Sequence, residues 1–142
     1  HIAQALVPMA TLAGYAITVV DPRAQWATPE RFPDTTLHVE WPDEWMEEAP
    51  PDTRTAVIVL THDPKIDDPA LEGALRSEAF YIGALGSRGN HGKRRQRLAK
   101  RGFDEAQLDR IHGPIGLAIG ARSPAEIAIA TLAQVTQALR QA

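Results

Sequence analysis

The sequence predicts an α/β fold, a three-layer, doubly wound and mostly parallel sheet. Strand-like apolar runs alternate with helical patterns along the whole chain. Residues 55–60 are apolar almost throughout, which is typical of a strand covered on both faces. Helix start signals such as Ser123-Pro124, with Glu126 close behind, separate the runs. Because no linker or repeat interrupts the alternation, we expect one domain over residues 1–142.

The predicted elements of the first half begin with a helix from His1 to Ala13, which contains Pro8 and ends at Gly14. Strands over residues 15–20 and 37–39 and an acidic helix over 43–48 follow. In the second half we expect a strand over 55–60, a helix that is capped by Asp68 and runs to about Arg76, and a strand over 79–82. A basic helix over 90–101 and a short helix capped by Asp104 come next. The chain then continues with a loop over 112–116, a strand over 117–119 and a final helix capped by Ser123.

Composition excludes several classes of protein. The 142 residues carry 15 basic and 18 acidic side chains, a formal net charge of −3, which excludes a generally basic nucleic-acid binder. The absence of cysteine excludes a disulfide framework, a thiolate zinc site and a cysteine nucleophile. No apolar run approaches the roughly 20 residues of a membrane span, and no signal peptide is visible. We therefore expect a soluble, cytoplasmic protein without a membrane or nucleic-acid partner.

Four loops are expected to form the binding edge of the sheet. In open parallel sheets, ligands sit beyond the carboxyl ends of the strands. That rule selects residues 21–23, 61–63, 83–88 and 112–116.

Asp21 has a specific interpretation. A dinucleotide-binding fold places an acidic residue at the end of its second strand, about 20 positions after a glycine-rich turn. If two glycines preceded His1, Ala3 would take the third position of that turn and Asp21 would bind ribose. The first strand and both glycines would then be missing from the chain. The alternative is that Asp21 simply ends a strand before Pro22.

Four stretches carry a family resemblance: Val-Val-Asp-Pro-Arg at 19–23, Leu-Thr-His-Asp-Pro-Lys at 60–65, Phe-Tyr-Ile-Gly-Ala-Leu-Gly-Ser-Arg at 80–88 and Arg-Ile-His-Gly-Pro-Ile-Gly-Leu at 110–117. In this order they resemble the C-terminal, Rossmann-type domain of the XdhC/CoxI family. The glycine–serine–arginine and histidine–glycine–proline stretches are the distinctive ones. In that family an N-terminal domain and the glycine turn precede this region, so we expect a C-terminal fragment of a longer protein.

The resemblance implies an accessory role rather than enzymatic turnover. Family members bind the molybdenum cofactor (molybdopterin), assist its sulfuration and insert it into xanthine- or carbon monoxide dehydrogenase-type hydroxylases. The implied partners are the molybdenum hydroxylase apoenzyme, a cysteine desulfurase and a second copy in a homodimer. An NAD(P)-dependent oxidoreductase or nucleotide-binding module remains the alternative, because the strand–Asp21 spacing alone would suit it.

The glycine-rich turn has a chemical rationale as a phosphate site. A flexible strand-to-helix turn followed by Arg88 supplies backbone amides, a cation and the positive end of a helix dipole. A plain glycine-rich turn is the alternative. The predicted cofactor-binding residues are Asp21, Arg23, Thr61, His62, Asp63, Gly83, Ala84, Leu85, Gly86, Ser87, Arg88, His112 and Gly113.

Other polar residues leave their roles open. His62 and Asp63 suit ligand binding or acid–base work, or else a turn at the end of a strand. His112 suits a ligand contact or a loop-carbonyl partner, while Gly113 and Pro114 favour a structural role. We predict no metal site, because no tight ligand spacing occurs, and no catalytic residue, because no complete catalytic constellation is visible.

Two clusters suit either packing or partner binding. Seven of the 15 basic residues fall between Arg88 and Arg101. They suit a solvated helix face, a cationic wall for an anionic cofactor or a docking patch for an acidic partner. Interleaved aromatic residues that would stack nucleic-acid bases are absent from this run. Trp26, Trp41 and Trp45 lie in or beside proline-bearing loops, which favours local packing.

Overall fold

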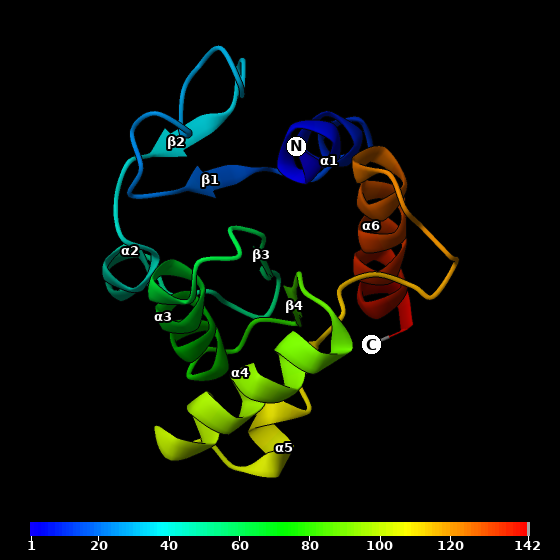
Figure 1. Ribbon diagram of the computed structural model, residues 1–142. Helices are drawn as coiled ribbons and strands as arrows, with labels where there is room; N and C mark the ends of the chain where they lie inside the picture. The colour runs from blue at the N-terminus through cyan, green and yellow to red at the C-terminus, as the bar shows by residue number, and fades with distance from the viewer. Residues whose placement is uncertain (142) are drawn as a thin grey trace.

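The computed structural model describes residues 1–141, which form six helices and five strands (Figure 1). Strand and helix alternate along the chain, as the sequence predicts. In chain order the elements are α1 (Ile2–Leu12), β1 (Thr18–Val20), β2 (Thr36–His38), α2 (Pro42–Glu48), β3 (Ala56–Val59), α3 (Pro64–Leu75), β4 (Tyr81–Ala84), α4 (Arg88–Lys100), α5 (Glu105–Leu108), β5 (Ile111–His112) and α6 (Pro124–Gln141).

All strand pairings are parallel, and helices cover both faces of the strands. Figure 1 shows α1 and α6 on one side of the strands and α2 and α3 on the other, which is the predicted doubly wound arrangement. β1 pairs with β2, and β4 lies between β3 and β5. In register, Val57 of β3 lies opposite Ile82 of β4, which lies opposite Ile111 of β5.

The sheet is divided into two parts, whereas the sequence predicted one. Within residues 1–141, no strand pairing joins β1 to β3. In a Rossmann sheet, the strands that correspond to β1 and β3 are both neighbours of the strand that precedes the first helix. The division therefore falls where a Rossmann order places that strand.

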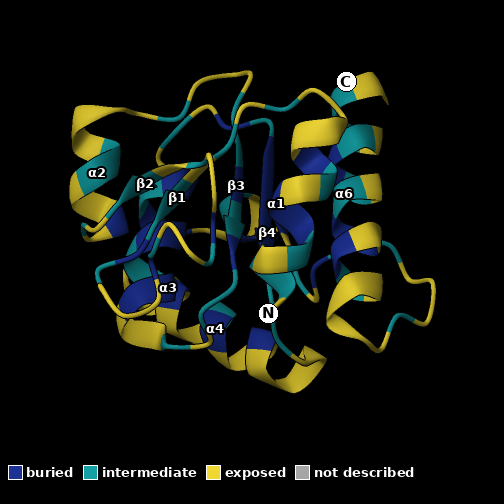
Figure 2. Ribbon diagram, turned by 90° about the horizontal axis from the view of Figure 1, so that it is seen from above, coloured by how far each residue is buried: buried dark blue, intermediate teal, exposed yellow. Residues whose placement is uncertain are grey.

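The main core lies between the three-stranded sheet and the helices α3 and α4. Leu71 and Ala74 of α3 are fully buried, as is Ala84 of β4, and Leu98 of α4 is 1% exposed. In Figure 2 the buried colour concentrates on the central strands and the inward faces of the helices. The complete cluster consists of Val57, Val59, Ala70, Leu71, Ala74, Leu75, Ala79, Ile82, Ala84, Leu98, Phe103, Leu108 and Ile111. This core holds β3 and β4 rigidly, and so fixes where their carboxyl ends lie.

Local capping signals place most helix starts. Asp104 caps α5 in a reciprocal capping box with Gln107, and the Ser123 hydroxyl accepts from the Glu126 amide at the start of α6. The prediction that Asp68 caps α3 is wrong. The cap is Asp63, whose carboxylate accepts from the Lys65 amide at 3.0 Å, while Asp68 binds Arg97 instead. Asp63-Pro64 and Asp68-Pro69 carry the same local signal, so only tertiary packing distinguishes them.

Three predictions in the second half are also wrong. β4 runs two residues later than the predicted 79–82, and β5 begins at Ile111, where a loop was expected from His112 onward. Residues 117–119 form no strand. The Leu117 amide donates to the Ala130 carbonyl of α6 rather than to a neighbouring strand, so this segment packs on a helix. No helix among residues 1–141 combines the length and the apolar character needed to cross a bilayer.

Candidate ligand-binding cleft

An open cleft of about 630 Å³ lies beyond the carboxyl ends of β3 and β4. The loops after β3, β4 and β5 and the first turns of α1 and α6 surround it. We call it the strand-end cleft. Its lining residues are Ile2, His62, Leu85, Gly86, Ser87, Arg88, Pro114, Ile115, Gly116, Leu117, Ala118, Gly120, Ala121, Ile127 and Ala130. Its volume lies in the range that small-molecule and cofactor sites occupy.

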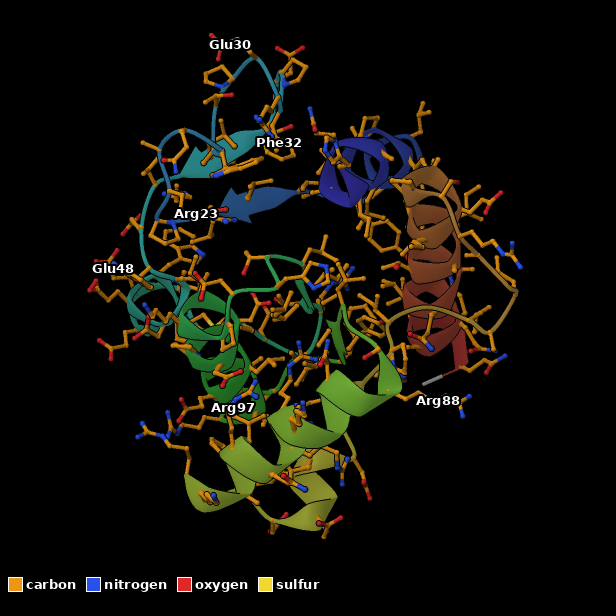
Figure 3. All side chains as sticks on the ribbon, in the orientation of Figure 1. Arg23, Glu30, Phe32, Glu48, Arg88 and Arg97 are labelled. Atoms are coloured by element: carbon orange, nitrogen blue, oxygen red, sulfur yellow. The ribbon has the colours of Figure 1, made fainter. Side chains whose placement is uncertain are left out.

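One end of the strand-end cleft is formed by the start of α4. The Ser87 hydroxyl caps α4 by accepting from the Asn90 amide at 3.1 Å. The other amides of the first helical turn have no acceptor within their own helix, and the helix dipole adds positive potential there. Arg88, the first residue of α4, extends from this turn into solvent (Figure 3). Amides, a hydroxyl and a guanidinium together suit a phosphate group.

The remaining walls of the strand-end cleft are mostly apolar. Leu85 and Ile115 lie on the sheet side, and Ile127 comes from α6. Ile2 adds the first turn of α1. In Figure 2 the N-terminus, α4 and the end of α6 opposite the C label lie along one side of the molecule. Apolar walls with a few polar groups at one end are typical of small-molecule and cofactor sites.

His62 reaches the strand-end cleft because a buried carboxylate fixes its backbone. Asp67 of α3 is 2% exposed and accepts hydrogen bonds from the amides of Thr61 and His62, at 3.3 and 2.9 Å, and from the Thr61 hydroxyl. His62 has a φ of 68°, a left-handed conformation that is unusual for a non-glycine residue. Burial raises the pKa of the Asp67 carboxyl, and the hydrogen bonds from Thr61 and His62 oppose that rise.

Asp21 and Arg23 bind each other at the end of β1. The Asp21 carboxylate accepts from the Arg23 amide at 2.9 Å, from Nε at 3.0 Å and from Nη2 at 2.9 Å. The hydrogen bond to Asp21 raises the pKa of the Arg23 guanidinium, and the charges of Asp63 and Asp67 add to that rise. Figure 3 shows Arg23 beside β1. Neither residue lines the strand-end cleft, and the Asp21 oxygens that would bind ribose already accept from Arg23.

The other predicted site residues support the cleft without lining it. Asp63 caps α3, and Gly83 and Ala84 are buried within β4. The His112 ring stacks on Tyr81 with 4.7 Å between ring centroids, although the residue is exposed on its other side. Gly113 lies against His91, where a Cβ would clash with the imidazole ring. The structure thus brings His62, Leu85, Gly86, Ser87 and Arg88 together at the cleft.

Ion pairs within the chain neutralise much of the basic helix. Arg95 binds Glu105 and Asp109 at 2.9 and 2.8 Å, and Arg97 binds Asp68 at 2.7 Å. Arg101 binds Glu72 at 3.1 Å, and Arg94 is buried. These pairings favour a structural role for the central part of α4 over a free docking patch. Arg88, at the start of the helix, is the basic residue that lines the cleft.

The tryptophans mainly make local contacts. Trp45 stacks on His38 with 3.9 Å between ring centroids. The Arg31 guanidinium lies 4.3 Å from the ring centroid of Trp26, which is 42% exposed. Within residues 1–141, no group of three or more histidine or acidic side chains could hold a metal ion.

The sequence did not predict the wall of the strand-end cleft that residues 114–121 form, nor the residue that fixes the backbone of His62. The sequence predicts a loop over 112–116 and a strand over 117–119, and nothing in the local pattern indicates that Leu117 packs on α6. The position of Asp67 in its helix does indicate a special role. It shares a helical stripe with Leu71 and Ala74, so a carboxylate falls on a face that is otherwise buried. A charged residue in such a position usually has a specific partner.

The lowered pKa values of two histidines predict that the protein loses stability as the pH falls. Burial lowers the pKa of His91 and of His112, and the charges of Arg94 and Arg95 lower that of His91 further. The unfolded state binds these protons more readily, so stability falls as the pH drops below about 6.5. Asp67 acts in the opposite sense, because burial raises its pKa. Urea unfolding at pH 7.5 and 5.5 checks this, and His91→Gln should flatten the difference. A stability that is constant or rises toward pH 5.5 would contradict it.

The family model of the XdhC Rossmann domain matches residues 1–135. Among curated proteins, a probable xanthine dehydrogenase subunit of Bacillus subtilis is 30% identical over 135 residues, 92% of this chain and 39% of that protein. "Molybdenum cofactor insertion chaperone PaoD" of Escherichia coli is 39% identical over 84 residues, 59% of this chain and 26% of that protein.

A solved structure shares the fold. The crystal structure of a xanthine dehydrogenase from Bacillus halodurans matches with a TM-score of 0.83 and 30% identity, over 99% of this chain and 40% of that one. The chain thus spans two fifths or less of the length of these relatives. The family match over nearly the whole chain agrees with the parallel strands, and the chain belongs to the XdhC Rossmann-domain family.

Proposed function

We propose that this chain holds the molybdenum cofactor while it is transferred into a molybdenum enzyme of the xanthine or carbon monoxide dehydrogenase type. The strand-end cleft is the observation that carries the proposal. Its polar end, formed by Ser87, Arg88 and the start of α4, adjoins apolar walls in a cleft of about 630 Å³. A molybdopterin carries a terminal phosphate on a flat heterocycle, so its phosphate suits the polar end of the cleft and its ring system suits the apolar walls.

Within this site each residue has a distinct role. Arg88 and the amides at the start of α4 bind the phosphate, and Leu85 and Ile115 pack against the ring system. His62 offers a ring nitrogen to the polar edge of the heterocycle. The open side of the cleft lets the apoenzyme approach the cargo.

We further propose that a cysteine desulfurase and a second copy of the chain assemble on the same protein in the cytoplasm.

NAD(P) binding is the second candidate, and one contact argues against it. A ribose needs free acceptor oxygens on the acidic residue at the end of the second strand. Asp21 directs both carboxylate oxygens at Arg23. Arg23 takes three of the roughly four acceptor positions of this carboxylate, so a ribose at this position competes with Arg23 for Asp21.

Arg88→Ala should weaken binding of the molybdenum cofactor by about ten- to a hundredfold. A hydrogen bond to a charged group contributes roughly 1.5–3 kcal/mol, and the exposed Arg88 makes no core contact whose loss would unfold the chain. Equilibrium binding of purified cofactor, with NAD as competitor, measures the effect. His62→Ala should also weaken binding, by a smaller factor.

Lys93→Ala is the matched control, because Lys93 is an exposed cation on the same helix that does not line the cleft. It should change the affinity less than twofold. Wild-type affinity in Arg88→Ala would place the cofactor elsewhere. Displacement of the cofactor by NAD at comparable concentrations would favour the nucleotide-binding alternative.

A further inference from the structure

One wall of the strand-end cleft is an irregular segment that packs on α6. It follows β5 and supplies Ile115, Gly116 and Leu117 to the lining of the cleft. In Figure 1 the connection that leads into α6, drawn in orange, passes across that helix before it turns back to the helix start. Residues 113–123 belong to no strand or helix, so no regular ladder of hydrogen bonds holds them in place. The position of this wall therefore depends on the acceptors that its own backbone amides find.

Three successive amides of this wall donate to acceptors on two different elements. The Ile115 amide donates to the Ala84 carbonyl of β4, and the Leu117 amide donates to a carbonyl of α6, each at 3.1 Å. Between them, the Gly116 amide donates to Oε1 of Gln134 in α6 at 2.9 Å. The first two acceptors are main-chain carbonyls, which any residue supplies. Gln134 is therefore the acceptor of the three whose identity matters.

The same oxygen of Gln134 also binds the sheet. The Tyr81 hydroxyl donates to it at 2.6 Å, and Tyr81 lies in β4 and is 1% exposed. A backbone N–H can only donate, so the amide atom of Gln134 that faces Gly116 is the oxygen, and the Tyr81 hydroxyl directs its hydrogen at that oxygen. Burial raises the pKa of the Tyr81 hydroxyl, which keeps this donor protonated. One carbonyl oxygen of α6 thus joins β4 to the cleft wall.

The wall lies as close to α6 as its backbone allows. Gly116 has a φ of 96°, and a Cβ at this position would come within 2.9 Å of the Ala130 Cβ and 3.2 Å of the helix backbone. Without the Gln134 oxygen, the Gly116 amide and the Tyr81 hydroxyl would both lose their acceptor, and the hydroxyl is too deeply buried to turn to water. Gln134 itself does not line the cleft, so it is not placed to touch a ligand.

We propose that Gln134 is a positioning residue of the strand-end cleft, which holds the wall from Ile115 to Leu117 at a fixed place between β4 and α6. Its oxygen fixes the middle amide of the three, and the flanking amides keep their acceptors only while that middle residue stays in place. Ile115 packs against the ring system of the cofactor under the proposed function, so the effect on affinity rests on that function. The hold on the wall does not.

The hold on the wall is tested first on the ligand-free protein, by amide hydrogen exchange of Gln134→Met. Methionine matches glutamine in length but has no carbonyl oxygen. We expect exchange of the Gly116 amide to accelerate about tenfold, and that of Ile115 and Leu117 to accelerate with it, although their own acceptors are intact. Gln134→Glu should restore protection, because a carboxylate accepts from both donors. Gln137→Met, an exposed glutamine on the same helix, is the matched control and should exchange as the wild type does. Acceleration confined to Gly116 would overturn the positioning role.

The second measurement is the affinity for the molybdenum cofactor. Gln134→Met should weaken binding about three- to tenfold, because a wall that visits other positions leaves a smaller fraction of the protein ready to bind. Gln134→Glu and Gln137→Met should bind as the wild type does. Each affinity is measured well below the unfolding midpoint of the variant, so that a loss of global stability does not lower it. Wild-type affinity in Gln134→Met, together with a lowered midpoint, would show a purely structural role and overturn the proposal.

Failure of this proposal and failure of the proposed function are distinguishable. If Arg88→Ala loses affinity while Gln134→Met binds as the wild type does, the positioning role is wrong and the proposed function stands. If Arg88→Ala binds normally, the proposed function fails, and the exchange rates of the Ile115 and Leu117 amides still decide whether Gln134 holds the wall. Should Gln134→Met not fold, Gln134→Asn decides in its place. Asparagine keeps the amide group but is one carbon shorter, so its oxygen cannot reach both donors, and the same two losses are expected.

Discussion

Gly83→Val should reduce the free energy of unfolding by about 3 kcal/mol, although valine favours strands more than glycine does. Gly83 lies in the middle of the three-stranded sheet. A Cβ at this position would come within 2.6 Å of the Tyr81 hydroxyl oxygen and 2.8 Å of the Ile115 side chain. Tyr81 is 1% exposed and its hydroxyl donates to Gln134 at 2.6 Å, so it has no room to move aside.

Gly83→Val should also affect ligand binding. Gln134 accepts from the Gly116 amide at 2.9 Å as well, so displacing Tyr81 disturbs a wall of the strand-end cleft. Gly92→Ala is the matched control, because a Cβ at Gly92 meets nothing within 4 Å. Gly92 lies within α4, where alanine should add up to about 1 kcal/mol. Urea unfolding measures both variants, and equal stability of Gly83→Val and the wild type would contradict the steric argument.

Arg110→Ala should cost about 3 kcal/mol of stability, far more than a typical surface arginine. Its guanidinium donates to the carbonyls of Leu75, Ser77 and Ala79 at 2.9, 3.1 and 3.1 Å. These carbonyls lie at the end of α3 and along the connection to β4, where a positive charge also favours the helix dipole. Removing the guanidinium leaves three partly buried acceptors without their donor.

Arg101→Ala is the comparison for Arg110→Ala. The Arg101 side chain is itself exposed, and its partner Glu72 keeps a second cation in Arg76, so the loss should be at most about 1 kcal/mol. Arg110→Lys should fall between wild type and Arg110→Ala, since an ammonium group cannot donate along the fork that reaches all three carbonyls. Thermal unfolding followed by circular dichroism ranks the variants. A loss in Arg110→Ala no greater than in Arg101→Ala would show that solvent replaces these hydrogen bonds.

Local chemistry made part of the fold predictable. The caps at Asp104 and Ser123 depend on side chains within one helical turn, and the strand over 56–59 depends on its own apolar residues. The start of α3 was mispredicted because two Asp-Pro pairs lie five residues apart, and only the inward orientation of Asp67 selects the first. The segment 117–119 was mispredicted because its partner is α6, which is distant in sequence.

The candidate site was predictable where it follows a strand. His62 and the turn from Leu85 to Arg88 come directly after buried strands, and they line the cleft. Asp21 also ends a strand, but its carboxylate binds Arg23, a short-range pairing that strand position alone does not indicate. The contributions of Ile2 and Ile127 come from helix starts at opposite ends of the chain. Which helix starts converge on one cleft is a property of the folded chain rather than of any local pattern.

The division between the β1–β2 pair and the three-stranded sheet has a consequence for how the two parts are held together. The smaller pair has no backbone hydrogen bonds to the larger sheet within residues 1–141, and it is tied to the rest through the packing of α1 on α6 and of α2 on α3. Two-stranded pairs have little stability of their own. The position of Asp21 and Arg23 relative to the three-stranded sheet therefore depends on packing between helices rather than on hydrogen bonds between strands.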